Sequence, residues 1–251
     1  MFLTTFASMQ YREVLYSNYH STQSGRASGT DAVSLFEREK RQFNREIIPL
    51  LKDISKNAAI FDMGCGSGSM LKALQENGFT NAGGMDISPE QVKVAAKMGA
   101  KNVVLGDALA HVASQNQTWD VLLGMDIIEH FTKNELVALL QNIQKSLKPG
   151  GIAFFRTPNL DAPVATVFAN GDFTHENYMN ASSAQQVCLA CGFKNVTVNP
   201  GIMFIENSLK EFIRKICWFL VKSQFKLYLF STARSSKNVI LGPNMVIVAK
   251  N

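Results

Sequence analysis

From residue 58 onward, short apolar runs alternate with segments in which apolar residues recur every three or four positions. The runs have the length of buried strands and lie at 59–62, 83–86, 101–105, 119–124 and 152–156. The segments between them, such as the one containing Leu71 and Leu74, have helical spacing. This alternation predicts an α/β fold in which a parallel sheet carries helices on both faces.

Two of the expected helices follow recognisable capping sequences. Ser88 precedes Pro89, which suits the first position of a helix, and Gln91 completes a capping box. Thr132 and Glu135 form the same pattern before the helix that leads to the fifth run. The sequence therefore predicts that helices begin directly after residues 88 and 132.

The chain on either side of this core follows a different pattern. Residues 34–51 have the spacing of one helix, and the polar segment 11–30 indicates a flap or short helix followed by a loop. The apolar face of the helix at 34–51 is expected to hold Leu35, Phe36, Phe43, Ile47 and Leu50. After residue 158 the expected elements are a helix at 183–191 and strands at 195–198 and 245–249.

The composition is that of a globular protein with a real core, because 46% of the residues are hydrophobic and 18% are charged. The four cysteines are too few and too scattered for a disulfide framework, which favours a reducing compartment. Cys188 and Cys191 form a CxxC pair in an apolar helical stretch, so we expect them to pack in the core. The N-terminal residues have no basic leader, and no stretch is long and apolar enough to span a membrane. We therefore expect a cytoplasmic protein.

The net charge of +5 is concentrated in one segment. Residues 207–238 contain seven basic side chains and one acid, whereas the rest of the chain is nearly neutral. A basic body that grips nucleic acid is therefore not expected. In the same segment Leu209, Phe212 and Ile216 belong to an apolar helical stripe. We expect this insert to pack on the sheet or on a second subunit, and contact with the inner face of an anionic membrane is the alternative.

The main chemical motif is the glycine-rich sequence 62–68, DMGCGSG, between a strand and a helix. Its glycines let a ligand approach the backbone N–H groups at the start of the helix. Ser69 stands where the dinucleotide fingerprint has its third glycine, and a pyrophosphate would be repelled by Asp62. A cationic ammonium group would instead be bound by that carboxylate, which argues against a nicotinamide-dependent oxidoreductase.

Two further acids close the next strands. Asp86 lies about twenty residues beyond the glycine turn, where a carboxylate can accept hydrogen bonds from ribose hydroxyls. Asp107 and the amide of Ala108 follow the third strand, where they could bind an adenine edge or form an ordinary turn. Because parallel sheets bind ligands at the carboxyl ends of their strands, these groups are expected in one site.

These motifs, in the order DMGCGSG, GMDIS, GDA, WDVLLGMDIIEHF and LKPGG, resemble those of the class I S-adenosylmethionine-dependent methyltransferases between residues 60 and 158. The resemblance implies a Rossmann-like fold with a seven-stranded, mostly parallel sheet, whose antiparallel last strand, 245–249, lies beside the fifth. It also implies that S-adenosylmethionine is the cofactor and S-adenosylhomocysteine the product. The implied cofactor-binding residues are Asp62, Gly64, Cys65, Gly66, Gly68, Asp86, Ile87, Asp107, Ala108 and Met125.

Later motifs, including DIIEHF and GDFTHE, resemble O-methyltransferases that act on small molecules, either of the surface-polysaccharide type or of the ubiquinone-biosynthesis type. The expected acceptor is accordingly a hydroxyl of a small molecule, a glycan or a lipid-linked compound. The single domain, 1–251, is expected to consist of a helical cap at 1–55, a cofactor-binding core at 56–160, a substrate lid at 161–182 and the basic insert at 200–243. A homodimer is compatible with this organisation.

Two histidines are the candidate catalytic residues. A sugar hydroxyl benefits from a general base, and His130 and His175 are expected in loops at the ligand-binding edge. The alternative for His130 is a structural role at the start of its helix. Asp126, Glu129 and His130 could also converge on a helical turn and hold a divalent ion, but we expect no metal. A non-catalytic module that merely binds the cofactor is the remaining alternative.

Overall fold

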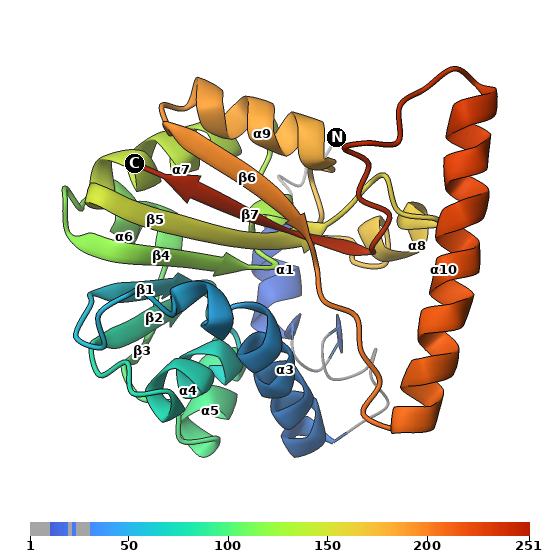
Figure 1. Ribbon diagram of the computed structural model, residues 1–251. Coiled ribbons are helices and arrows are strands. Elements are labelled where there is room, and N and C mark those ends of the chain that lie inside the picture. The colour runs from blue at the N-terminus through green and yellow to red at the C-terminus, as the bar shows by residue number, and fades with distance from the viewer. Residues whose placement is uncertain (1–10, 20–21, 24–30) are drawn as a thin grey trace, which may run out of the picture.

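The computed structural model describes residues 11–19, 22–23 and 31–251. Within these residues seven strands form one sheet in the order β3-β2-β1-β4-β5-β7-β6 (Figure 1). The strands are β1 (Ile60–Met63), β2 (Ala82–Asp86), β3 (Val103–Leu105), β4 (Trp119–Met125), β5 (Leu147–Pro158), β6 (Asn195–Pro200) and β7 (Asn244–Lys250). Strands β1 to β5 pair in parallel, and β7 runs antiparallel between β5 and β6. The predicted Rossmann-like sheet, with its reversed last strand beside the fifth, is confirmed.

Helices cover both faces of the sheet (Figure 1). The α-helices are α1 (Tyr11–Ser17), α3 (Ala32–Glu46), α4 (Ser69–Glu76), α5 (Pro89–Lys97), α6 (Ala108–Ala113), α7 (Lys133–Ser146), α8 (Ala165–Ala169), α9 (Ala181–Ala190) and α10 (Ser208–Ser231). The 3-10 helices are η2 (Ile48–Leu51) and η3 (Ile128–His130). One core cluster joins the sheet to α6, α7 and α9, and the other joins it to α3, η2 and α4. Because neighbouring strand residues point to opposite faces, Phe155 belongs to the first cluster and Phe154 to the second.

The local capping signals are used in full at α7 and in part at α5, where the Ser88 amide donates to Asp86 Oδ1 instead of the predicted bond to the Gln91 side chain. The Ser88 side chain accepts a hydrogen bond from the Gln91 amide at the start of α5, and Pro89 is the first residue of that helix. Thr132 and Glu135 form a reciprocal capping box at the start of α7. These contacts fix where α5 and α7 leave the carboxyl edge of the sheet, which is the edge that carries the candidate site.

The helix expected over residues 34–51 is interrupted. Helix α3 ends at Glu46, and a 3-10 turn continues from Ile48 to Leu51 around Pro49. A proline has no amide hydrogen to continue the α-helical bonds, which accounts for the change. Consequently Leu51 is buried and Leu50 is exposed, so the prediction that Leu50 lies on the apolar face was wrong. Strand β5 is also longer than expected, because the LKPGG segment already pairs with β4.

The insert packs less closely than expected. Among the described residues one side of α10 is partly buried and no residue of the helix is fully buried, so the helix does not enter the core of the sheet. Packing on a second subunit stays a prediction. Figure 1 shows α10 standing apart, on the side toward which β4 and β5 point. Across the described residues, no helix is long and apolar enough to cross a membrane. By contrast, Cys188 and Cys191 are buried free thiols in the core, as predicted.

Candidate active site

A cavity of about 260 Å³ opens at the carboxyl ends of β1, β2 and β4. Five of the ten expected cofactor-binding residues line it, namely Gly64, Asp86, Ile87, Asp107 and Ala108. The proposed base His130 lines it as well, together with Asp126, Phe131 and three residues of the N-terminal segment, Arg12, Tyr16 and Tyr19. The structure therefore brings the cofactor motifs and one catalytic candidate to a single cavity.

The remaining five expected cofactor residues do not line this cavity. They are Asp62, Cys65, Gly66, Gly68 and Met125. Cys65 and Met125 pack in the hydrophobic core cluster of α3 and α4. Contact between the cofactor and these two side chains accordingly stays a prediction, whereas Asp62 and Gly66 have features that suit a ligand.

The carboxylate of Asp62 is buried without a partner. Its side chain is 1% exposed, and Oδ1 has no hydrogen bond among the described residues. Burial, with a smaller contribution from Asp86, raises the pKa of Asp62 well above its ordinary range. An unpaired buried charge is costly, so this position is stabilised by an incoming cation. The α-ammonium group of S-adenosylmethionine is a cation of this kind, and the residues fit it.

The glycine turn leaves its backbone accessible. Gly64, Gly66 and Gly68 all have positive φ values, of 63°, 52° and 78°, which side chains rarely adopt. A Cβ atom added to Gly66 would meet nothing within 4 Å, whereas one added to Gly64 would lie 2.5 Å from Ile127 Cδ1. Open space beside Gly66 is what the close approach of a ligand to the backbone requires.

The two strand-end acids are held by different contacts. Asp86 accepts hydrogen bonds of 2.8 Å from the amides of both Gly66 and Ser88, and it faces the cavity. Each carboxylate oxygen retains a second lone pair for ribose hydroxyls. Asp107 is exposed, and its side chain caps α6 by accepting from the amides of Leu109 and Ala110. Its carboxylate is thus used for local structure, and the neighbouring Ala108 lies at the cavity wall.

The N-terminal helix α1 closes one side of the cavity. Arg12 donates two hydrogen bonds to Glu135, of 2.7 and 2.8 Å, and a third of 3.0 Å to the carbonyl of His130. The rings of Tyr16 and Tyr19 stand edge-on to the His130 imidazole, with centroids 6.3 Å away in both cases. The cap segment is therefore bound directly to the loop that carries the proposed base.

A hydrogen-bond chain fixes the state of His130. The Thr174 hydroxyl donates its single hydrogen to Asp172 Oδ1 at 2.6 Å, so it must accept at 2.8 Å from the Nδ1–H of His130. Nε2 is therefore the nitrogen free to accept a proton. Burial, assisted by the nearby His175, lowers the pKa of His130 to about 4, which keeps the ring neutral near pH 7.

Asp172 supplies a negative charge to this chain. Burial alone would raise its pKa, but hydrogen bonds from Thr174 and Tyr19 hold the pKa below its ordinary value. The Tyr19 hydroxyl donates to Asp172 Oδ2 at 2.6 Å. The charge of Asp172 can stabilise an imidazolium that forms when His130 takes up a proton.

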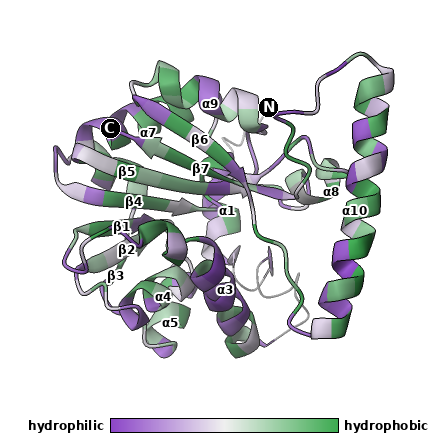
Figure 2. Ribbon diagram, in the orientation of Figure 1, coloured by the Kyte–Doolittle hydropathy of each residue, from purple (hydrophilic) through white to green (hydrophobic). Residues whose placement is uncertain are grey.

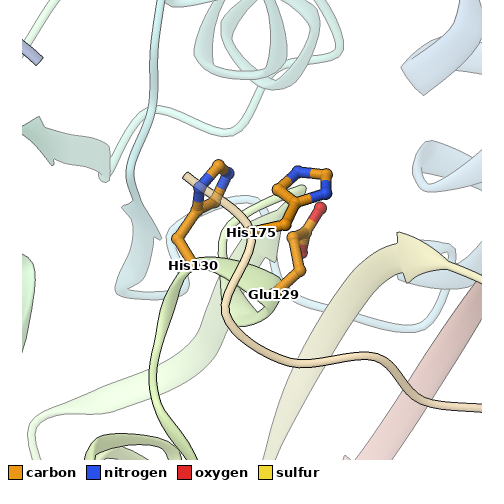
Figure 3. Close-up of side chains that lie close together, drawn as sticks. All are labelled: Glu129, His130 and His175. Atoms are coloured by element: carbon orange, nitrogen blue, oxygen red, sulfur yellow. The ribbon is translucent and has the colours of Figure 1, made fainter. Parts of the chain in front are cut away.

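Figure 3 shows Glu129, His130 and His175 gathered at one place. Nδ1 of His175 donates to the carbonyl of Ala169 at 2.6 Å, which leaves its Nε2 free as well. One ligand atom from each of the three residues lies within 4.8 Å of the others, so this group, found among the described residues, could hold a divalent cation. Burial, together with the charge of Asp126, raises the pKa of Glu129 to about 8.

Asp126 does not share this cluster, although the sequence spacing had grouped it with Glu129 and His130. It has a φ of 53° and precedes η3, so the three residues do not occupy one regular helical turn. Its carboxylate instead forms a bidentate ion pair with Arg156. The third member of the group is His175, from a segment far away in the sequence.

Sequence reasoning overlooked several residues of the site. Thr174 and Asp172 orient His130, and Tyr16, Tyr19 and Arg12 enclose it. Asp172 and Thr174 lie more than forty positions from His130 in the sequence, and the three N-terminal residues lie more than one hundred positions from it. Both segments lack a periodic pattern. The only sequence signal was the concentration of aromatic and polar residues in two otherwise irregular segments.

Comparison with known proteins agrees with this geometry. A family model described as a methyltransferase domain matches residues 35–198. No curated protein sequence matches the chain. Among solved structures, an S-adenosylmethionine-dependent methyltransferase from Archaeoglobus fulgidus is similar with a TM-score of 0.65 and 20% identity, over 86% of this chain and 94% of that one.

Two further structures have the same fold at lower identity. One is a possible histamine N-methyltransferase from Thermotoga maritima, with a TM-score of 0.58 and 12% identity over 95% of this chain and 99% of that one. The other is phosphoethanolamine N-methyltransferase 2 from Haemonchus contortus in complex with S-adenosylmethionine, with a TM-score of 0.59 and 15% identity over 94% of this chain and 60% of that one. The family match covers well over half of the chain and includes the glycine turn, the strand-end acids and both histidines. The chain therefore belongs to the methyltransferase domain family, and it is an S-adenosylmethionine-dependent methyltransferase.

Proposed function

We propose that this enzyme methylates a hydroxyl oxygen of a small-molecule, glycan or lipid-linked acceptor, with His130 as the general base. The observation that carries the proposal is the chain Asp172–Thr174–His130, which leaves Nε2 of a neutral imidazole as proton acceptor beside the cofactor cavity. An alcohol is a poor nucleophile until its proton is removed, whereas the nitrogen of a neutral amine is already a good nucleophile. A base oriented in this way therefore favours an oxygen acceptor.

Each part of the cavity has one task in this mechanism. When bound, S-adenosylmethionine supplies an activated methyl group. Asp62 neutralises the ammonium group of the amino acid portion, and Asp86 accepts hydrogen bonds from the ribose. His130 would accept the hydroxyl proton, so that the acceptor oxygen is ready to receive the methyl group that the bound cofactor supplies. Helix α1 excludes water from the cavity through the Arg12–Glu135 contact.

His130 is assigned this role rather than His175 because of their positions. His130 lines the cavity and is connected to Asp172, whereas His175 lies behind it, with ring centroids 4.8 Å apart, and is bound to a backbone carbonyl. His175 is placed to receive the proton from the site or to orient His130. We therefore expect a smaller kinetic effect at His175 than at His130.

The proposal is tested with S-adenosylmethionine carrying a radiolabelled methyl group and a panel of acceptors. The panel contains nucleotide sugars, polyprenyl-phosphate-linked sugars, catechols as models of quinone precursors, and primary amines. We expect label in hydroxyl acceptors, as ethers that resist acid and base, with turnover falling sharply in His130→Gln. Sugar and catechol acceptors separate the polysaccharide and quinone alternatives.

Two results would contradict the proposal. Transfer to amines alone, with His130→Gln fully active, would replace the oxygen acceptor by a nitrogen one. Tight binding of S-adenosylhomocysteine without turnover on any acceptor class, in wild type and in variants alike, would favour a module that binds the cofactor without catalysis.

A further inference from the structure

Helix α10 turns an apolar face, interrupted at Ser223, away from the rest of the protein. The large side chains of this face are between 47% and 80% exposed, and they are Leu209, Phe212, Ile213, Ile216, Phe219, Leu220, Leu227 and Phe230. Their spacing, mostly three or four residues with one step of seven between Leu220 and Leu227, places them on one side of the helix. Figure 2 shows apolar residues at intervals along all of α10. An apolar surface of this extent marks an interaction site.

The opposite side of α10 faces the protein. Its partly buried side chains recur at the same helical spacing and include Trp218, Val221, Phe225 and Leu229. Trp218 and Phe225 line two cavities, of about 630 and 480 Å³, between the helix and the segment around residues 237–242. The orientation of α10 is therefore defined by this inner side, and the apolar outer face is left without a partner in the described chain.

Lysines border the apolar face. At 100° per residue, Lys215, Lys222 and Lys226 fall along one margin of the outer face and Lys210 along the other. The single acid of the helix, Glu211, is already bound by Arg214 through two hydrogen bonds of 2.7 Å. An apolar stripe with a row of three lysines along one margin and one lysine on the other suits the boundary between acyl chains and anionic headgroups.

A second copy of the chain fits this face less well. In a two-fold dimer the same patch meets itself, so the lysine margins would approach one another or the Lys210 margin. Glu211 is turned toward Arg214, so neither margin offers a carboxylate to pair with them. Like charges at such a seam are unfavourable, whereas the same lysines are attracted by an anionic lipid surface.

We propose that α10 lies in the plane of an anionic membrane surface and holds the enzyme there. Figure 1 shows α10 on the side toward which β4 and β5 point, and the segment between β5 and α9 exposes Val164, Val167 and Phe173 on its own surface. Docking through α10 turns the cavity edge of the sheet toward the lipid. Resting on the proposed function, this orientation favours an acceptor hydroxyl carried on a lipid.

The natural cysteines provide a direct probe. Cys217 is an exposed thiol on α10, whereas Cys65, Cys188 and Cys191 are buried. The native protein is labelled at Cys217 with an environment-sensitive nitrobenzoxadiazole maleimide. It is then mixed with vesicles of phosphatidylcholine alone or of phosphatidylcholine with 30% phosphatidylglycerol. We expect flotation with the anionic vesicles and a several-fold rise in emission, both weakened by added salt.

Matched variants separate α10 from the rest of the surface. We expect Phe212→Glu with Phe219→Glu to reduce binding by roughly tenfold or more, whereas Val33→Glu with Leu189→Glu, at other exposed apolar positions, leaves it unchanged. Replacement of Lys215, Lys222 and Lys226 by Glu is expected to reduce vesicle binding as strongly as Phe212→Glu with Phe219→Glu. The control, in which the exposed residues Lys52, Lys93 and Lys97 are replaced by Glu, is expected to keep vesicle binding.

Absence of binding to anionic vesicles would overturn the proposal, as would binding that the α10 variants do not alter. A stable dimer that dissociates in Phe212→Glu with Phe219→Glu, measured by sedimentation, would assign the face to a second copy instead. Thermal stabilisation by S-adenosylhomocysteine is measured on every variant. A variant that is still stabilised by S-adenosylhomocysteine but no longer binds vesicles is folded and has lost only membrane docking. This result supports the docking proposal whether or not the acceptor is a hydroxyl.

Discussion

The two ends of the cavity differ in how their polar groups are satisfied. At the β1 end, Asp62 is a buried carboxylate whose Oδ1 has no partner. At the η3 end, His130 belongs to a completed chain through Thr174 to Asp172. An unpaired buried charge is stabilised by a ligand, whereas a completed chain holds a group in one orientation and protonation state. The first arrangement suits the binding of a cation, and the second suits the proton transfer that we propose.

This difference has an energetic consequence. Before the cofactor binds, the Asp62 carboxylate destabilises the fold, because desolvation is not offset by any hydrogen bond to Oδ1. In the His130 chain, by contrast, Nδ1 is hydrogen-bonded to Thr174. This bond helps to hold the segment that contains Thr174 against His130. Substitutions at the two ends should accordingly separate binding of the cofactor from turnover.

The largest expected effect is at the proton-directing end. His130→Gln removes the base while retaining a polar side chain of similar length, so kcat is expected to fall by about 10²–10⁴-fold. The dissociation constant of S-adenosylhomocysteine should change by less than about threefold, because the Asp62 end is untouched. Steady-state kinetics with the acceptor identified in the panel, together with calorimetry, measure both quantities.

Thr174→Val sharpens this prediction, since it keeps the shape of the side chain and removes the link to Asp172. We expect kcat to fall by roughly tenfold, because Nε2 remains but its orientation and charge support are lost. An unchanged kcat in Thr174→Val would separate Asp172 from catalysis. A parallel loss of cofactor affinity in His130→Gln would show that the two ends are not independent.

The next largest effect is at the binding end. Asp62→Asn keeps the side-chain shape and removes the charge, and Asp62→Ala removes both, so affinity for S-adenosylhomocysteine should fall by about 100-fold or more in Asp62→Ala. The free energy of unfolding of the unliganded Asp62→Asn protein should not decrease, because an unpaired buried carboxylate is removed. Urea denaturation measures it. A clear loss of stability in Asp62→Asn would mean that the carboxylate has a structural partner.

A pH dependence follows from the lowered pKa of His130. Histidine in the unfolded chain titrates near 6.5 and His130 near 4, so its contribution to stability is complete above about pH 6.5 and is lost as the pH falls through about 4. The difference in unfolding free energy between wild type and His130→Gln should shift by up to about 3 kcal/mol between pH 7 and pH 4.

The variant comparison is necessary because Glu129 acts in the opposite direction. Its folded pKa is raised to about 8, so the stability that it contributes is present at low pH and lost as the pH rises from about 4.5 through 8. Glu129 is common to both proteins, so most of its contribution cancels in the difference. A difference that does not change with pH would show that His130 titrates normally in the folded state.

The smallest expected effect is that of metal removal. If His130 acts as a base, EDTA should leave kcat unchanged, and added Zn²⁺ should lower it by occupying the imidazole nitrogens. Wild type and His175→Ala are compared, since loss of His175 removes one ligand of the possible site and should relieve inhibition. Inactivation by EDTA, reversed by a divalent ion, would make Glu129, His130 and His175 a catalytic metal centre instead.

Much of the cofactor region could be predicted because its signals are local. A glycine turn after a strand, an acid at the end of the next strand and two N-capping sequences each lie within a few residues of one another. Through the resemblance to known methyltransferases, such signals also implied seven strands and an antiparallel last strand beside the fifth. The helix expected over residues 34–51 was predicted less well. Pro49 ends its regular hydrogen bonding, and as a result Leu51 rather than Leu50 packs in the core.

The sequence by itself determined the α/β fold, the cofactor turn and the pairing of a basic segment with an apolar helical stripe, because these depend on periodicity and neighbouring residues. Only the tertiary structure decided that His175 rather than Asp126 stands with Glu129 and His130, and that α10 buries none of its residues. Contacts across tens of residues depend on how the elements pack, and the same amphipathic pattern suits a helix that meets the core or one that meets another surface.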